Sequence, residues 1–179
     1  QPGHGHRDFG SFELHHADEQ IFLDPGRRSY SPDGEADLSA QSHNTLTIDD
    51  AEPYPINRLY YGDKFRRSVS GGAPVLRQGD DHFVLQTVSF GRLENGMIWQ
   101  RQWTFTSGQL EIEDRIEGRG AHVVCRYFQT RQAVSIDATR HSSVTTMGPV
   151  QLHSDVEPQV KDAFVWTEYG KSMPAKRLI

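Results

Sequence analysis

The sequence predicts an all-β fold, an antiparallel β-sandwich in supersandwich-type layers, as one domain over residues 1–179. Three observations predict it. Apolar and polar residues alternate with a period of two in several short segments. Tight-turn sequences such as Asn95-Gly96 and Ser107-Gly108 separate those segments. No stretch keeps a convincing helical period over three turns, and the 16 glycines and 9 prolines favour strands and turns.

The first part of the chain predicts three strands and one long loop. Residues 11–16 alternate, and QIFLD predicts a second strand that ends at Asp24, because Pro25 and Gly26 stop it. A third strand is predicted over residues 43–49. The polar segment 27–42 between them is long enough to indicate a functional loop.

The middle of the chain gives the clearest strand signals. Two apolar segments flank Asn95-Gly96, a pair typical of a type I′ hairpin turn. In the next segment Leu110, Ile112 and Ile116 share one face. The predicted strands of this half cover residues 82–93, 97–105, 109–118, 121–128, 143–147 and 163–169.

Composition excludes several classes of function. The formal net charge of -5 and the pI of about 6.0 argue against a general nucleic-acid binder. No apolar run approaches the roughly 20 residues that cross a bilayer. The single cysteine, Cys125, excludes an internal disulfide framework and a cysteine-based zinc site.

Histidines and one aspartate form a candidate metal site. His4 and His6 are two residues apart, so in extended backbone both imidazoles project from one face. Asp24 ends one predicted strand and His43 begins another. Imidazole and carboxylate ligands suit a borderline ion such as zinc. From spacing alone, surface histidines and a metal site are both open, since the chain has 9 histidines.

Three segments in order resemble the heparinase II/III-like family. They are HGHRDFGSFEL, IFLDPGRRSY and SHNTLTID, and their order and approximate spacing follow the family pattern over the first fifty residues. The resemblance implies the C-terminal β-sandwich of a polysaccharide lyase that acts on uronate-containing chains such as heparan sulfate and alginate. It also implies an upstream α/α toroid domain, which we expect this fragment to lack, and a periplasmic or secreted enzyme.

The resemblance also assigns roles to individual residues. His6, Asp24 and His43 match positions that bind zinc, and His4 matches a histidine that lines the catalytic cleft. Arg7 stands where alanine is usual, and it either binds an anionic substrate or points to solvent. Tyr30 either lines the cleft or packs on the sheet.

Asp8 and Glu13 also recur in the family pattern. We expect them to hold histidine tautomers beside the metal.

The chemistry that the resemblance implies is β-elimination across C4 and C5 of a uronate. A base takes the C5 proton and an acid protonates the O4 leaving group, and His4 either suits one of these roles or neutralises the uronate carboxylate. Zinc is expected to hold strands and loop beside the cleft. This chain alone, without an upstream domain, is expected to have little or no activity.

Two alternative functions remain. A metal-dependent cupin also uses a His-x-His pair, but its carboxylate usually follows within about four residues, whereas Glu13 falls seven after His6. A non-catalytic carbohydrate-binding module is suggested by aromatic residues that can stack on sugars or belong to the core. These are Tyr54, Tyr60 and Tyr61.

Overall fold

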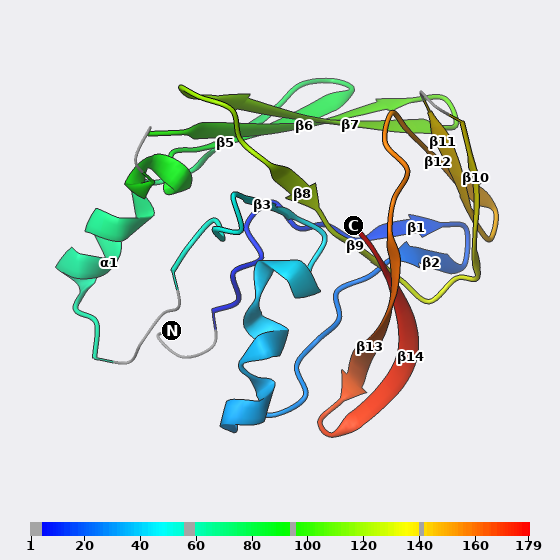
Figure 1. The fold of residues 1–179 in the computed structure, drawn as a ribbon, viewed down its shortest axis with the longest axis horizontal. Helices are drawn as coiled ribbons and strands as arrows, with labels where there is room; N and C mark the ends of the chain where they lie inside the picture. The colour runs from blue at the N-terminus through cyan, green and yellow to red at the C-terminus, as the bar shows by residue number, and fades with distance from the viewer. Residues whose placement is uncertain (1–4, 56–59, 94–95, 140–141) are drawn as a thin grey trace. The chain divides into compact units, whose positions relative to one another are not determined.

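The computed structural model describes residues 5–55, 60–93, 96–139 and 142–179 (Figure 1). Strands dominate these residues, and the strand pairs with a defined register are all antiparallel, which confirms the predicted all-β fold. Two compact units divide the chain. The first consists of Gln1–Gly10 and Ile48–Val123, and the second of Ser11–Thr47 and Val124–Ile179. Among the described residues, no helix is long and apolar enough to cross a membrane.

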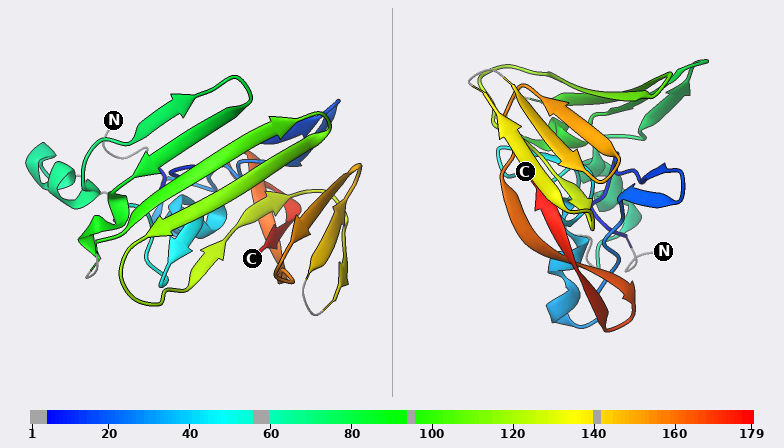
Figure 2. Two further views of the ribbon diagram at one scale, coloured as in Figure 1. Left: turned by 90° about the horizontal axis from the view of Figure 1, so that it is seen from above. Right: turned by 90° about the vertical axis from the view of Figure 1, so that its right-hand side faces the viewer.

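The first unit is built on one four-stranded sheet. Its strands follow chain order, and the long strands β6 and β7 lie side by side (Figure 2). The strands are β4 (Val75–Gln78), β5 (His82–Thr87), β6 (Ile98–Thr106) and β7 (Gln109–Glu117). The predicted turn at Ser107-Gly108 joins β6 to β7, while Asn95 of the other predicted turn lies outside the described residues.

One face of β6 carries the centre of this unit. Trp99, Arg101 and Trp103 alternate as buried residues along the strand. Opposite them, the predicted apolar face of β7 also contains Asp114, which pairs in register with Arg101. The two charged side chains are both fully buried and form an ion pair. The sheet therefore has a paired charge at its centre rather than a purely apolar face.

Two short helical segments of the first unit differ from the sequence prediction. Helix α1 (Asp63–Ser70) is eight residues long. It is therefore shorter than three helical turns, the length over which no helical period was found in the sequence. It ends at Gly71, whose φ of 72° is left-handed and where a Cβ would lie 2.4 Å from the carbonyl oxygen of Val88.

The strand predicted over residues 82–93 ends at Thr87. A 3₁₀ segment, η4 (Ser89–Arg92), follows it. The side chain of Arg92 donates hydrogen bonds to the carbonyl oxygens of Ser89 and Pro53. This tertiary contact favours the turn over a longer strand.

The second unit contains the remaining sheets and the long loop. β1 (Leu14–His16) pairs with β2 (Glu19–Phe22), and β3 (Leu46–Ile48) pairs with β8 (Val124–Arg126). A three-stranded sheet contains β10 (Val134–Ala138), β11 (Ser143–Met147) and β12 (Val150–Ser154). Another contains β13 (Val160–Glu168), β14 (Lys171–Leu178) and β9 (Phe128–Thr130), with β14 in the centre (Figure 2).

Two apolar clusters hold the second unit together. The rings of Phe22 and Phe128 stack with centroids 5.0 Å apart, and Phe12 meets both edge-on. A second cluster joins the segment after β2 to the β13–β14 hairpin. It contains Leu23, Ala163, Val165 and Ala175, with Met173 packed against it.

The predicted loop over residues 27–42 folds as three single 3₁₀ turns, η1 (Pro32–Gly34), η2 (Ala36–Leu38) and η3 (Ala40–Ser42). The strand predicted over 11–16 begins only at Leu14, because the Ser11 hydroxyl instead accepts a hydrogen bond from the backbone N–H of Asn44.

Candidate functional site

The Asp-Pro-Gly turn after β2 fixes the position of Asp24. Its Oδ1 accepts a hydrogen bond of 2.8 Å from the backbone N–H of Gly26, which closes an Asx turn. Gly26 has a φ of 67°, and a Cβ there would lie 2.4 Å from the carbonyl oxygen of Trp166. The N–H of Trp166 in turn donates to the carbonyl of Pro25. Glycine is required here because the turn lies directly against β13.

His43 follows η3 and meets Asp24 in the second unit. The His43 side chain is fully buried, and its Nδ1 lies 3.0 Å from Oδ2 of Asp24. Its Nε2 lies 3.1 Å from the carbonyl oxygen of Asp37. The structure therefore brings together two predicted site residues that are nineteen positions apart in the sequence.

These two contacts define the tautomer of His43. A carbonyl oxygen only accepts, so Nε2 carries the hydrogen that it donates to Asp37. In a neutral imidazole, Nδ1 is then an acceptor that faces a carboxylate oxygen. The 3.0 Å between Nδ1 and Oδ2 is also an ordinary hydrogen-bond distance, and the same two atoms are of the types that ligate a metal ion.

The geometry of the pair fits a metal ion such as zinc. Two ligand atoms on one tetrahedral zinc, each about 2.0–2.1 Å from it, lie about 3.3 Å apart, and Nδ1 and Oδ2 are 3.0 Å apart. A histidine that ligates a metal typically donates its other N–H to a carbonyl or carboxylate, as Nε2 does here. Asp24 and His43 therefore offer donor atoms that suit a metal ion, at a separation that a hydrogen bond between them also gives.

Asn44, next to His43, fixes the backbone on which the histidine sits. Its side-chain amide donates to the carbonyls of Phe12 and Leu23, at 2.7 and 3.0 Å, and its Oδ1 accepts from the N–H of Gln129 at 2.7 Å. Asn44 is fully buried. One side chain thus satisfies three backbone groups from segments far apart in the sequence.

His43 is oriented by Asp37, a residue that no sequence pattern indicated. The backbone carbonyl of Asp37 contacts Nε2 of His43, and its carboxylate accepts from the N–H of Arg28. The carboxylate of Glu13, expected to hold a histidine tautomer, lies 3.4 Å from Nε2 of His15 and also accepts from the backbone N–H of Asp24 at 3.4 Å. A backbone carbonyl leaves no trace in a residue pattern, so no sequence signal pointed to it.

The other predicted site residues of the N-terminal segment lie in the first unit or outside the described residues. His4 lies outside them. His6 belongs to the first unit. Arg7 forms an ion pair with Glu52 within the first unit, so its charge already has a partner there. Its role toward substrate stays a prediction.

Tyr30 belongs to the second unit and is exposed. Its ring stacks with that of Tyr169, with centroids 6.2 Å apart and planes 20° apart. The guanidinium carbon of Arg27 lies 4.6 Å from the centre of the Tyr30 ring. Tyr30 therefore lies on the exposed surface of the loop over residues 27–42, rather than in the core.

Residues 1–169 match the family model described as "Heparinase II/III-like, C-terminal". No curated protein matches the sequence. The crystal structure of heparan sulfate lyase HepC from Pedobacter heparinus is similar in fold, with a TM-score of 0.67 at 19% identity. That match covers 98% of this chain and 28% of the HepC chain.

Proposed function

The chain belongs to the heparinase II/III-like family through that family's C-terminal domain, and we propose that it forms the β-sheet part of a polysaccharide lyase. The proposed substrates are uronate-containing glycans, cleaved by β-elimination. The observation that carries the proposal is the Asp24–His43 pair, with Nδ1 turned toward the carboxylate and Nε2 held by Asp37. These are two of the three zinc positions that the family resemblance assigns.

We propose His6 as the third protein ligand. A site with three ligands from separate segments of the chain would link those segments when zinc is bound. The elimination needs a base, an acid and stabilisation of negative charge, none of which requires a metal-bound hydroxide. Zinc is therefore assigned a structural role.

The proton chemistry falls to His4 and to residues of a partner domain. The base removes the C5 proton, the C4–O4 bond breaks, the C4–C5 double bond forms, and the acid protonates O4. The C5 proton is α to a carboxylate, so the intermediate carries negative charge that nearby donors must stabilise. His4 is proposed as the acid or the base. The remaining groups are assigned to an upstream α/α toroid domain.

A carbohydrate-binding module without catalytic activity is the second candidate. Tyr60 is 81% exposed and packs edge-on against Tyr61, as expected of an aromatic available for a sugar. Tyr54 instead packs against Phe9. A cupin is not supported, because the described strands form five separate sheets rather than one closed barrel.

A lyase assay separates the two candidates. The chain is expressed with an α/α toroid domain upstream and, in parallel, as residues 1–179, and both are incubated with heparan sulfate, chondroitin sulfate and alginate. We expect ultraviolet absorbance from an unsaturated uronate product only with the longer chain, since catalysis needs acid, base and carboxylate-binding groups in register. Robust turnover by residues 1–179, or binding by the longer chain without any unsaturated product, would contradict the proposal.

A further inference from the structure

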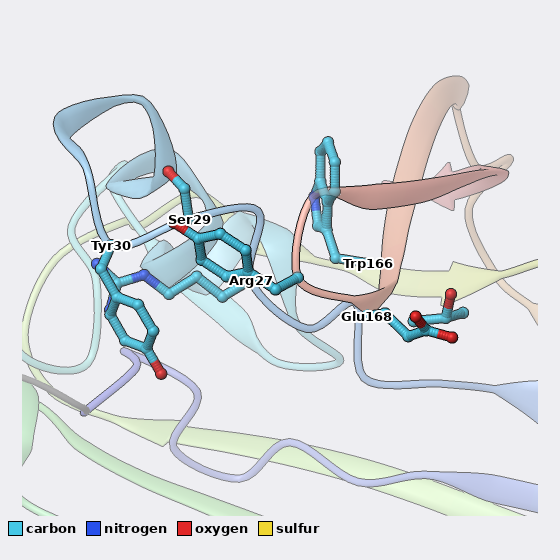
Figure 3. Close-up of a pocket in the computed structure, with 7 residues that line it drawn as sticks. Arg27, Ser29, Tyr30, Trp166 and Glu168 are labelled. Atoms are coloured by element: carbon cyan, nitrogen blue, oxygen red, sulfur yellow. The ribbon is translucent and has the colours of Figure 1, made fainter.

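The second unit contains a pocket between the loop after Asp24 and the end of the β13–β14 hairpin. Its volume is about 300 Å³, at the small end of the range for ligand pockets. Figure 3 shows Arg27, Ser29 and Tyr30 on one side, and Trp166 and Glu168 on the other. Thr167 and Tyr169 complete the lining. The pocket thus combines the loop after Asp24 with the turn of the β13–β14 hairpin.

Backbone contacts hold the two walls of this pocket together. The N–H of Trp166 donates to the carbonyl of Pro25, and the N–H of Gly170 donates to the carbonyl of Arg28. The β13–β14 register shifts between Trp166 and Glu168, which indicates a bulge at this end of the hairpin. Bulges are common where a strand must redirect side chains next to a site. The walls are therefore fixed by the fold rather than by side chains alone.

Arg27 is a cation on the pocket wall without an acidic partner. Its Nε and Nη1 are buried and make no hydrogen bond, and within the described part of the chain no carboxylate pairs with it. The guanidinium lies over the face of Tyr30. Buried N–H groups of a cation that lack an acceptor favour any ligand that supplies one. An anionic oxygen is the acceptor that satisfies a guanidinium best.

Two tyrosines of the pocket lining are exposed, and Trp166 is half-buried. Tyr30 is 65% exposed and Tyr169 is 70% exposed, and their rings are nearly parallel. Trp166 lies under the guanidinium of Arg28, 4.8 Å from its ring centre. Flat aromatic faces beside a cation suit a ligand with an apolar face and an acidic substituent, as a uronate or a sulfated sugar has.

Glu168 is the acidic residue of the pocket lining, and a lysine offsets its charge. Its Oε2 lies 2.5 Å from Nζ of Lys171 in the same hairpin turn. Arg27 adds a positive charge on the opposite wall, and the guanidinium of Arg28, which does not line the pocket, lies over the ring of Trp166. The local balance therefore favours an anion.

We propose that this pocket binds one acidic residue of a glycan. Arg27 would receive the carboxylate or sulfate group, and the tyrosines would contact the sugar ring. This inference deepens the proposed function and rests on it for the class of ligand. The pocket would add affinity for an acidic chain, and none of its lining residues is assigned a part in the proton chemistry.

Calorimetric titration of the 179-residue chain tests the proposal directly. The ligands are a heparan-type oligosaccharide, an alginate oligosaccharide without sulfate, inorganic sulfate, and a neutral oligosaccharide of the same length. We expect both acidic oligosaccharides to bind more tightly than inorganic sulfate, the neutral one not to bind, and affinity to fall as salt is added.

Variants assign the binding to the pocket. Arg27→Gln is expected to weaken binding about 10- to 100-fold, the loss of a charge-assisted contact, and Arg27→Lys is expected to weaken it less. Arg115→Gln is the matched control, because Arg115 is an exposed arginine paired with Glu113 in the first unit. Tyr169→Ala, at an exposed position, tests the pocket independently if Arg27→Gln fails to fold.

Three results would overturn the proposal: equal binding of neutral and acidic oligosaccharides, no binding of any, or full affinity in both Arg27→Gln and Tyr169→Ala. The lyase assay is separate from this titration. Binding of acidic oligosaccharides without formation of an unsaturated product would overturn the proposed lyase activity but not the proposed pocket. Turnover without binding at the pocket would overturn the pocket but not the lyase activity.

Discussion

Replacing Asp114 with alanine is expected to lower the free energy of unfolding by about 3–5 kcal/mol, the usual cost of leaving one charge of a buried pair alone. Asp114 accepts from Nε and Nη2 of Arg101, at 2.8 and 2.9 Å, and from Nε1 of Trp99 at 2.8 Å. Both charged side chains have no solvent exposure. The variant would leave a guanidinium buried at the centre of the four-stranded sheet without its carboxylate, while Nη1 still donates to the carbonyl of Gly10.

Urea unfolding followed by tryptophan fluorescence measures this loss. The control is Glu113→Ala on the same strand, since Glu113 forms an exposed ion pair with Arg115 that should contribute no more than about 1 kcal/mol. The double variant Arg101→Met with Asp114→Ala should recover much of the lost stability, because it removes the unpaired charge. Equal midpoints for Asp114→Ala and Glu113→Ala would show that the buried pair does not stabilise the sheet.

Replacing His4 with alanine is expected to cut turnover of the longer, toroid-containing chain by roughly 100- to 10,000-fold, as expected when a general acid or base is lost. The reason is the role that the resemblance gives to His4, a cleft residue two positions from a metal ligand but not itself a ligand. Zinc content and melting temperature should stay nearly unchanged. Product absorbance, zinc analysis and thermal unfolding of the same preparation measure the three quantities.

His6→Ala is the comparison for this experiment. It is expected to lose metal and melting temperature first, with activity falling as a consequence. His4→Ala is therefore expected to lower activity without loss of zinc, whereas His6→Ala is expected to lose zinc first and activity as a consequence. Full activity of His4→Ala, or loss of zinc in His4→Ala to the same degree as in His6→Ala, would show that the separate roles are wrong.

Strands with strict alternation could be predicted from the sequence. Short elements, and element ends that depend on tertiary contacts, could not. Leu110, Ile112 and Ile116 set the register of β7, and the structure confirms that strand as an alternating one. Helix α1 was missed because eight residues carry too little period to distinguish them from a loop. The end of β5 at Thr87 depends on contacts of Arg92 with a distant segment, which no local pattern contains.

The residues of the candidate site could likewise be predicted from the sequence only in part. Asp24 and His43 could be found because each lies in a short motif, and the structure brings their side chains together. Asp37 acts through a backbone carbonyl, so its identity as a residue type carried no signal. The pocket around Arg27 depends on Trp166 and Tyr169, more than 130 positions away, and only the folded hairpin places them beside it.

The zinc content of the 179-residue chain, purified without added metal, tests the central claim most directly. We expect about one zinc per chain, a lower content in Asp24→Ala, and a lower melting temperature for that variant, since a ligand that binds only the folded state stabilises it. Asp33→Ala, which removes an exposed acid of the same loop, should keep both values. A wild-type chain without metal, or an Asp24→Ala chain with a full complement of zinc, would contradict the assignment of Asp24 and His43 as metal ligands.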